Sequence, residues 1–374
     1  MISMYYWIAK MELHKNNALT FKKGFTFSEN INMRKLSIIV FVLVSFISKA
    51  KAQAQEKNLI AVGFYNLENF YDTLNDPNTD DDEFTPNGAN SYTPEVFKKK
   101  IENLSDVISQ MGTDKSKDGM AFFGVAEIEN ASVLKALCNS PKLKSRNLKV
   151  VQFDGPDGRG VDCGFIYNPK LFKLLASESL TVPVEVGDRP TRDVLHVVGV
   201  LVTDTVHVFV NHWPSRRGGE AATREKRKIA AGVSKKVIDS LMAINPNTKV
   251  FDMGDLNDDP TNKSLTEVLQ AKGKIEEVKE GGMFNPWMSF YKKGLGSMAY
   301  NDAWSLFDQC IISYGVINQQ NKGLVYDHAE VFSRSFMVEK FGQYKGYPKR
   351  SYSGGNWNDG YSDHFPTIIY LKSN

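Results

Sequence analysis

Short polar motifs follow or open most of the apolar, β-branched segments of this chain. They supply carboxylates, amides and two imidazoles, the side chains that bind hard cations and transfer protons. The candidate residues are Asn66, Glu68, Glu127, Asn211, His212, Asp255, Asn257, Asp308, Asp363 and His364. Ligands collect at strand ends in open α/β sheets, so we expect these side chains to gather at one edge. Together they suit hydrolysis of a phosphate ester, which needs a divalent metal, an oriented water and a proton donor.

The segments before these motifs predict the elements that position them. Nine runs are predicted as strands, at 59–64, 121–125, 149–153, 163–167, 196–202, 205–210, 249–253, 309–313 and 367–371. The clearest helix spans 94–110, where Thr93 supplies the N-cap, and similar patterns cover 223–244 and 264–271. Strands occur both in hairpins and in alternation with helices. This mixture predicts an α/β fold in which two sheets pack face to face with helices outside.

The composition is that of an ordinary globular protein, with 42% apolar and 24% charged residues among 374. Residues 33–52 combine a basic start, a short apolar run and terminal small residues, the pattern of a secretory signal peptide. The apolar run is too short to span a membrane. We therefore expect export to the periplasm or the medium, with 53–374 as a single domain. Residues 1–32 are interpreted as an upstream extension from a misassigned start codon.

Net charge limits the substrates that this chain can bind. Without residues 1–52 the chain has 38 Lys and Arg against 41 Asp and Glu, a formal charge of −3. The apparent basicity of the full chain, +3, therefore belongs to the leader. A mildly acidic domain excludes a broad phosphate-binding surface, so any nucleic-acid contact must come from a local basic patch.

Cysteine usage and acidic residues together indicate the class of metal. Cys138, Cys163 and Cys310 allow one disulfide at most, and we expect them to be small buried hydrophobes. The chain has no Cys/His cluster, which favours Mg²⁺, or Mn²⁺ or Ca²⁺, over structural zinc. Glu127 is the best candidate ligand and Glu68 a second contact. The alternatives are that Glu127 caps the following helix and that Glu68 faces solvent in a loop.

The ordered motifs carry a family resemblance. NLEN, GVAEIEN, NHWPS, GDLND, the Asp of FDQCIIS and SDHFP occur in the order found in the endonuclease/exonuclease/phosphatase superfamily. The chain thus resembles DNase I, exonuclease III and the inositol polyphosphate 5-phosphatases over residues 58–372. NHWPSRRGG and DGRGVDCGFIYNP are similar to segments of secreted, endonuclease-like bacterial members. The resemblance implies a four-layered α/β/β/α sandwich and a divalent-metal-dependent phosphoesterase.

The resemblance also implies roles for the motifs of the second half of the chain. Asp255 would act on the attacking water, and Asn257 would orient the phosphate or contact the transition state. Asp308 would fix the tautomer of His364 and raise the basicity of its ring. His364 would then act as a base or as a phosphate ligand. Asp363 would support the metal, with capping of its turn as the alternative.

The remaining motifs are assigned in the same way. His212 would donate a proton to the leaving oxygen, and Asn211 would hold it next to the substrate. Asn66 would orient the phosphate or a metal-bound carboxylate. The alternative for His212 is a structural role at the end of an apolar strand.

Side chains outside the motifs are candidates for substrate contact. Arg159 and Arg216 are candidate phosphate ligands, because guanidinium groups bind phosphate oxygens in a bidentate manner. The Gly-rich segment 272–304 contains the aromatic residues Tyr291, Tyr300 and Trp304. These either line a wall on which bases stack or form the core of a long insertion.

We therefore predict an exported phosphodiesterase or endonuclease that cleaves nucleic acid by metal-assisted, in-line attack of water. We expect a monomer without a stable membrane anchor. One alternative is a phosphatase or phosphodiesterase for lipid head groups or small phosphate esters. Another is a non-catalytic binding protein, which would be expected to have lost at least one of Glu127, His212, Asp255 and His364. A glycoside hydrolase would account for two carboxylates but not for the two histidines.

Overall fold

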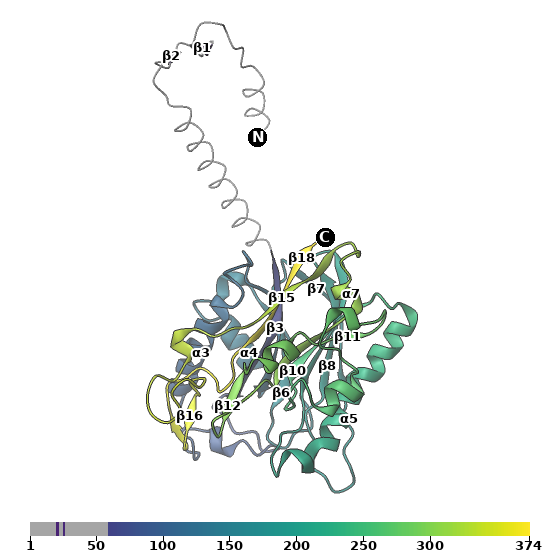
Figure 1. Cartoon of the computed structure of the whole chain (residues 1–374). Coiled ribbons are helices and arrows are strands. Elements are labelled where there is room, and N and C mark those ends of the chain that lie inside the picture. Colours follow the sequence, from purple (N-terminus) through teal and green to yellow (C-terminus); the bar gives the residue numbers. More distant parts are fainter. Residues whose placement is uncertain (1–19, 22–24, 27–58) are drawn as a thin grey trace. The chain divides into compact units, whose positions relative to one another are not determined.

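The computed structural model describes residues 59–374 and, upstream of them, the two short strands β1 (Thr20–Phe21) and β2 (Phe25–Thr26) (Figure 1). The signal peptide predicted at 33–52 lies outside the described residues. So does the upstream extension predicted at 1–32, apart from those two strands. Within the described part of the chain, no helix combines the length and the hydropathy needed to cross a bilayer.

Two six-stranded sheets form the centre of the compact unit Lys57–Asn374. The first sheet, in the order β15-β18-β3-β4-β6-β5, consists of β3 (Ile60–Phe70), β4 (Met120–Ile128), β5 (Lys149–Gln152), β6 (Asp162–Tyr167), β15 (Leu324–Val331) and β18 (Thr367–Ser373). The second, in the order β11-β14-β10-β9-β8-β7, consists of β7 (Phe172–Leu180), β8 (Val194–Leu201), β9 (Asp204–His212), β10 (Lys249–Asp255), β11 (Met283–Phe284) and β14 (Asp308–Ser313). Each sheet has one parallel pair at its centre, β3 with β4 and β9 with β10.

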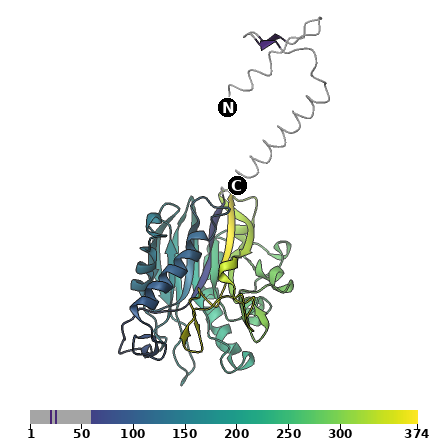
Figure 2. The same cartoon turned by 90° about the vertical axis from the view of Figure 1, so that its left-hand side faces the viewer.

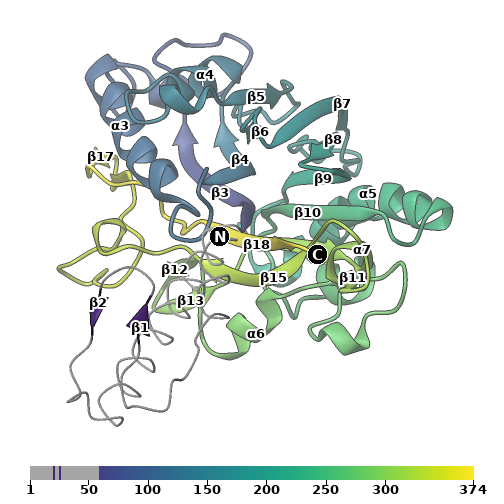
Figure 3. The same cartoon turned by 90° about the horizontal axis from the view of Figure 1, so that it is seen from above.

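Helices cover the outer face of each sheet and complete four layers, α/β/β/α. The helices α3 (Pro94–Gln110) and α4 (Ala131–Cys138) pack on the first sheet, and α5 (Glu220–Ile244) packs on the second. Figure 2 shows α3 lying across the first sheet, and Figure 3 shows α5 on the far side of the sandwich. The other elements are short: η1 (Asp82–Phe84), η2 (Lys144–Arg146), η3 (Ser264–Val268), η4 (Ile275–Glu277), α6 (Trp287–Lys292), β12 (Met298–Tyr300), β13 (Ala303–Ser305), α7 (Tyr314–Ile317), η5 (Ser335–Met337), β16 (Tyr352–Ser353) and β17 (Asn356–Trp357).

Alternation along the strands builds the layers, because successive strand residues point to opposite faces of a sheet. Phe122 is buried between the two sheets, with its ring 5.2 Å from Phe165 and 5.7 Å from Phe251. The next residue, Phe123, packs instead in the cluster under α3 and α4. Burial of one such ring stabilises the fold by about 1.5–3 kcal/mol, so the sandwich holds both strand sets rigidly.

The nine predicted strands are all present, and most extend further than predicted. The helix at 94–110 has the predicted bounds, and Thr93 caps it by accepting from the backbone N of Val96. The helix predicted at 264–271 is present only as η3, a five-residue π-helical turn that lies next to α5. The edge strands β7 and β15 were not predicted, since their exposed faces interrupt the apolar pattern.

The described cysteines behave as predicted. Cys138, Cys163 and Cys310 are all free and buried. Burial raises the pKa of the Cys138 thiol to about 12, so it is unreactive at neutral pH.

Candidate active site

The second sheet contributes three candidate residues at one edge. In the register of the sheet, Asp255 at the end of β10 pairs with His212 at the end of β9. On its other side Asp255 pairs with Asp308, the first residue of β14. The antiparallel direction of β14 brings the start of that strand to the place where β9 and β10 end. Sheet topology therefore puts an imidazole and a second carboxylate on either side of Asp255.

The first sheet presents its own polar edge to the same place. Asn66 and Glu127 lie near the ends of the parallel strands β3 and β4, and His364 lies just before β18. Asn66 donates from Nδ2 to Oδ2 of Asp255 over 3.0 Å, a bond between residues of different sheets. Where the two sheets meet, one group of side chains is thus formed, which we name the catalytic cluster: Asn66, Glu127, His212, Asp255, Asp308 and His364.

Asp255 is at the centre of the catalytic cluster. Its Oδ2 lies 3.8 Å from Nε2 of both His212 and His364, and its Oδ1 accepts from the backbone N of Asn257 over 3.1 Å. Burial raises the pKa of Asp255 to about 7; the charge of His364 opposes this shift and the carboxylate of Asp308 adds to it. Asp255 is therefore a carboxylate able to accept a proton near neutral pH.

His364 is held as an imidazolium. Its Nδ1 lies 2.6 Å from Oδ2 of Asp308, which also accepts from Oγ of Ser297. Burial alone would lower the pKa of His364, but the carboxylates of Asp308 and Asp255 outweigh it and hold the pKa well above its ordinary value. Its Nε2 consequently presents a proton and a positive charge to the space that Asp255 faces.

His212 has the opposite charge state. Burial lowers its pKa well below the ordinary value, and the positive charges of Arg192 and Arg159 lower it further. Its Nε2 lies 3.9 Å from Oε1 of Glu127. Its Nδ1 is buried without a hydrogen-bond partner among the described residues. The ring is therefore neutral, and Nε2 is the nitrogen that faces the cluster.

The acidic residues of the cluster fit a hard cation, and Glu127 is the carboxylate best placed to hold one. Ligand atoms of Asp255, Asp308 and His364 lie within 4.8 Å of one another, but an imidazolium has no free lone pair for a metal. Glu127 has one oxygen, Oε2, bound to the backbone N of Asn69, and its Oε1 faces His212. A carboxylate with one oxygen free for a metal suits a cation that keeps several of its waters, such as Mg²⁺.

Glu68 and Asp363, the other predicted metal ligands, are joined by an arginine. Glu68 accepts from the backbone N of Ser351 over 2.6 Å and lies 3.4 Å from Nε of Arg350. The same guanidinium lies 2.8 Å from Oδ2 of Asp363, whose Oδ1 is 3.8 Å from Nε2 of His364. Burial raises the pKa of Glu68 to about 7. Both oxygens of Glu68 are thus used within the protein, which places it beside the cluster and not in it.

Asn211 does not reach the cluster, in contrast to the expectation from its motif. Its Nδ2 donates to Oδ1 of Asp252 over 2.7 Å, and its Oδ1 accepts from Trp213 and from Ser234 of α5. Consecutive residues of a strand face opposite ways, so when His212 faces the cluster Asn211 must face α5. Its role is to join β9, β10 and α5.

Arg216 and Asn257 are also used within the protein. Arg216 lies 3.3 Å from Asp258 and 3.2 Å from Asp259, and it stacks over the ring of Phe307. Asn257 has a positive φ of 48° and donates from Nδ2 to the backbone O of Trp213 over 3.0 Å. Arg216 therefore shapes the turn after β10 and does not face the cluster.

Arg159 remains available to a substrate. Its side chain is 46% exposed and lies 3.2 Å from Asp157. Its charge adds to the effect of burial in lowering the pKa of His212. Arg159 is thus a partly exposed cation at the edge of the cluster.

Several residues that support the cluster were not among the predicted site residues. The buried Arg192 donates to the backbone O of His212 over 3.1 Å and pairs with Asp157 over 2.9 Å. Ser362 donates to the backbone O of Asn66 over 2.7 Å and accepts from the backbone N of His364. Arg192 and Arg350 lie in loops without a motif, so only the fold reveals them; Ser362 could have been found as the first residue of SDHFP.

The two-sheet sandwich and the catalytic cluster define the class: hydrolases of phosphate esters on a DNase I-like fold. The model of the Endonuclease/Exonuclease/phosphatase family matches residues 61–373. The chain belongs to this family, and it is a phosphoester hydrolase. Enzymes of this family are generally dependent on divalent metal ions.

Solved structures with the same fold have low sequence identity. TDP2 of D. rerio, complexed with a single-strand DNA product, is 12% identical with a TM-score of 0.50, covering 84% of this chain and 99% of that one. Mannosyl-6-phosphatase of Bacteroides thetaiotaomicron is 14% identical, with the same TM-score and coverage. No curated protein sequence matches the chain. At these identities the likeness concerns the fold alone.

Proposed function

We propose that this protein is an exported, divalent-metal-dependent phosphodiesterase that cleaves nucleic acid. The observation that carries the proposal is the charge arrangement around Asp255. A carboxylate with a raised pKa lies 3.8 Å from an imidazolium, His364, and 3.8 Å from a neutral imidazole, His212. A phosphodiester hydrolase needs a proton acceptor for water, a cation for the phosphate and a donor to the leaving oxygen.

Each residue of the catalytic cluster has one step in this scheme. Asp255, oriented by Asn66, accepts the proton of the attacking water. His364 holds a non-bridging phosphate oxygen through Nε2, because Asp308 keeps its ring protonated. His212 is neutral, so it supports the charge on the leaving oxygen by a hydrogen bond from Nε2, and the leaving alkoxide takes its proton from a solvent water rather than from an imidazolium. This departs from the proton donation expected from the resemblance.

Glu127 is the residue that would hold the cation, and a bound Mg²⁺ or Mn²⁺ would neutralise phosphate charge. Glu127→Gln should raise the Mg²⁺ concentration for half-maximal activity at least tenfold, because one ligand charge is lost. Titration of activity with Mg²⁺ after chelation measures this shift. Glu129→Gln is the matched control, since the Glu129 carboxylate accepts from the backbone N of Asp72. An equal shift in both variants would refute the assignment.

Exposed aromatic residues beside the cluster support nucleic acid as the substrate. The hairpin of β12 and β13 carries Tyr300, 71% exposed, and Trp304, 38% exposed. Trp304 stacks on Phe365, the residue after His364, with centroids 6.2 Å apart. These rings are therefore not the core of an insertion, and they offer a surface on which an unpaired base stacks.

Trp304→Ala should raise the KM for a single-stranded oligonucleotide about tenfold, since stacking of one base contributes about 1–3 kcal/mol. The KM for a small chromogenic bis-phosphodiester, which has no base to stack, should change far less. Trp304→Phe keeps a ring and should restore most of the affinity. Steady-state kinetics on the two substrates measures both effects, and an unchanged KM in Trp304→Ala would refute a stacking role.

The proposed function is tested by incubating the protein with duplex DNA, single-stranded DNA, RNA and a bis-phosphodiester, with Mg²⁺, Mn²⁺ or Ca²⁺ and with chelator. Metal-dependent cleavage of nucleic acid supports it. Cleavage of the small ester alone would move the substrate to lipid head groups or small phosphates. The absence of any cleavage would favour a binding protein. Export is tested separately by N-terminal sequencing of exported protein, which should begin near Gln53.

A further inference from the structure

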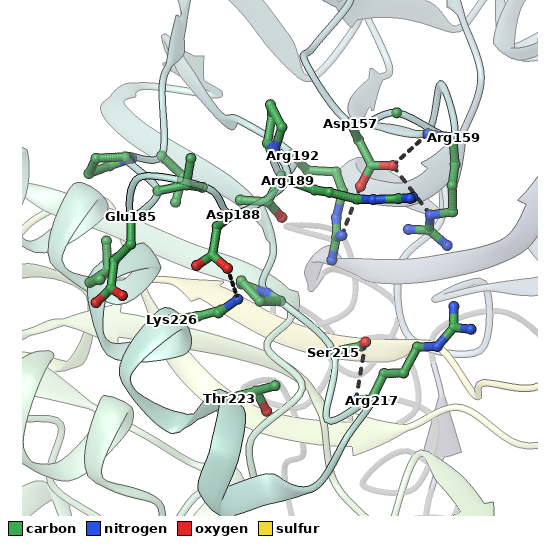
Figure 4. A pocket seen from close by; sticks show the side chains of 18 of the residues that line it. Asp157, Arg159, Glu185, Asp188, Arg189, Arg192, Ser215, Arg217, Thr223 and Lys226 are labelled. Atoms are coloured by element: carbon green, nitrogen blue, oxygen red, sulfur yellow. Dashed lines mark hydrogen bonds and ion pairs between the residues drawn. The ribbon is translucent and has the colours of Figure 1, made fainter. Parts of the chain in front are cut away.

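A pocket of about 440 Å³ opens beside the catalytic cluster, and most of its charged walls are basic (Figure 4). Three loops and the first turns of α5 line it, at 157–159, 182–192, 214–217 and 223–229. The basic side chains are Arg159, Arg189, Arg192, Arg217 and Lys226, against the acidic Asp157, Glu185 and Asp188.

Two of these cations are neutralised within the protein. Arg192 is buried and pairs with Asp157 over 2.9 Å, and Lys226 lies 2.7 Å from Asp188. These pairs hold the loop at 182–192 against β9 and α5 and give the pocket a fixed wall.

The other three cations remain available to a ligand. Arg189 is 92% exposed, and its nearest carboxylate in the described chain, Asp80, is 3.9 Å away. Arg159 shares Asp157 with the buried Arg192. The hydrogen bond that Arg217 makes comes from its backbone N, to Oγ of Ser215, and Figure 4 shows its guanidinium extending to the same side as that of Arg159. The pocket therefore keeps an excess of positive charge.

The pocket is joined to the chemistry through β9. Arg192, in its wall, donates to the backbone O of both His212 and Trp213. Arg159, at its mouth, affects the pKa of His212. In the second sheet the order is β14-β10-β9-β8-β7, so the pocket lies on the β9 side of Asp255. The aromatic hairpin leads into β14, on the other side of Asp255.

We propose that this pocket binds a second phosphodiester group of the same nucleic-acid chain, with Arg159, Arg189 and Arg217 as its ligands. The inference rests on the proposed function and specifies its substrate as a strand with several phosphates. Guanidinium groups suit phosphate because they bind its oxygens in pairs. The folded domain is acidic overall, so a local basic pocket is the way in which it can hold a polyanion.

The experiment compares a dinucleotide, which has one phosphodiester, with a tetranucleotide, which has three. The kcat/KM of the unaltered protein should be higher for the tetranucleotide than for the dinucleotide. In the double variant Arg189→Ala/Arg217→Ala, the ratio of these two kcat/KM values should be about tenfold smaller. The slope of log KM against log salt concentration should become shallower by about 0.7 for each lost contact.

The control variant, Lys236→Ala/Lys274→Ala, removes the same charge from α5 and from the residue before η4, outside the pocket. It should keep the gain with length and the salt slope. An equal loss in both double variants would show a general charge effect and overturn the pocket. So would an undiminished gain in the arginine variant while the unaltered protein cleaves both substrates. If the unaltered protein cleaves neither substrate, the proposed function fails as well.

Discussion

Replacing Asp255 by asparagine is expected to lower kcat about a thousandfold, because the amide cannot accept the proton of the attacking water. Asparagine has the same shape, but its single amide oxygen can accept from only one of Asn66 and Asn257, so the melting temperature should fall by a few degrees while the protein stays folded. Steady-state kinetics and thermal unfolding measure the two effects.

Proton transfer from the attacking water depends on Asp255 in its ionised form. Burial raises the pKa of this group to about 7, so kcat/KM should rise with pH around neutrality. An ordinary carboxyl group would give this rise at a much lower pH.

The same strand offers a matched control for this substitution. Asp252 is also buried on β10, and burial raises its pKa to about 7 as well. It faces Asn211 and not the catalytic cluster. Asp252→Asn should therefore leave kcat within a few fold of the unaltered protein. If Asp255→Asn retains more than a tenth of the activity, or if the two variants lose it equally, Asp255 is not the proton acceptor.

The contrast between Asp255 and Asp252 explains which parts of the site the sequence could predict. Strand runs and the polar motifs after them were visible as patterns, so the positions of His212, Asp255 and His364 at one edge were predictable. Successive residues of a strand point to opposite faces of the sheet, but a motif such as NHW does not show which of its residues points to the cluster. Asn211 was therefore assigned to the cluster although its neighbour alone faces it.

Long-range ion pairs were beyond any local pattern. Arg350 pairs with Glu68, 282 residues before it, and with Asp363, and it lies in a loop without periodicity. Arg192 likewise pairs with Asp157 and donates to the backbone O of His212 at the end of β9. The edge strands β7 and β15 were not predicted for a different reason. A strand that is solvated on one face and along its edge carries many polar residues, so its sequence resembles that of a loop.

Replacing His364 and replacing Asp308 should reduce activity with different dependences on pH. His364→Gln removes the imidazolium and should lower kcat about a hundredfold or more at every pH, because the phosphate loses a buried cation. Asp308→Asn keeps the ring but removes the charge that keeps it protonated. The pKa of His364 should then fall, because burial lowers it and only the carboxylates of Asp255 and Asp363 still oppose burial. The ring of this variant should lose its proton as pH rises, so its activity relative to the unaltered protein should fall from acid to neutral pH.

Rate profiles from pH 5 to 9 for both variants, each divided by that of the unaltered protein, separate the two roles of this pair. Loss of the imidazolium in His364→Gln removes a charge that lowers the pKa of Asp255, so the ratio for that variant should stay level or rise with pH. Such a ratio, with a falling ratio for Asp308→Asn, means that Asp308 acts by holding the proton at Nε2 of His364. A ratio for Asp308→Asn that does not fall would mean that Asp308 only positions the ring. Ser297 bears on that distinction, because its hydroxyl donates to the same Asp308 oxygen and keeps contact with the amide oxygen after substitution. Orientation should thus survive in Asp308→Asn while charge does not, which makes charge the variable under test.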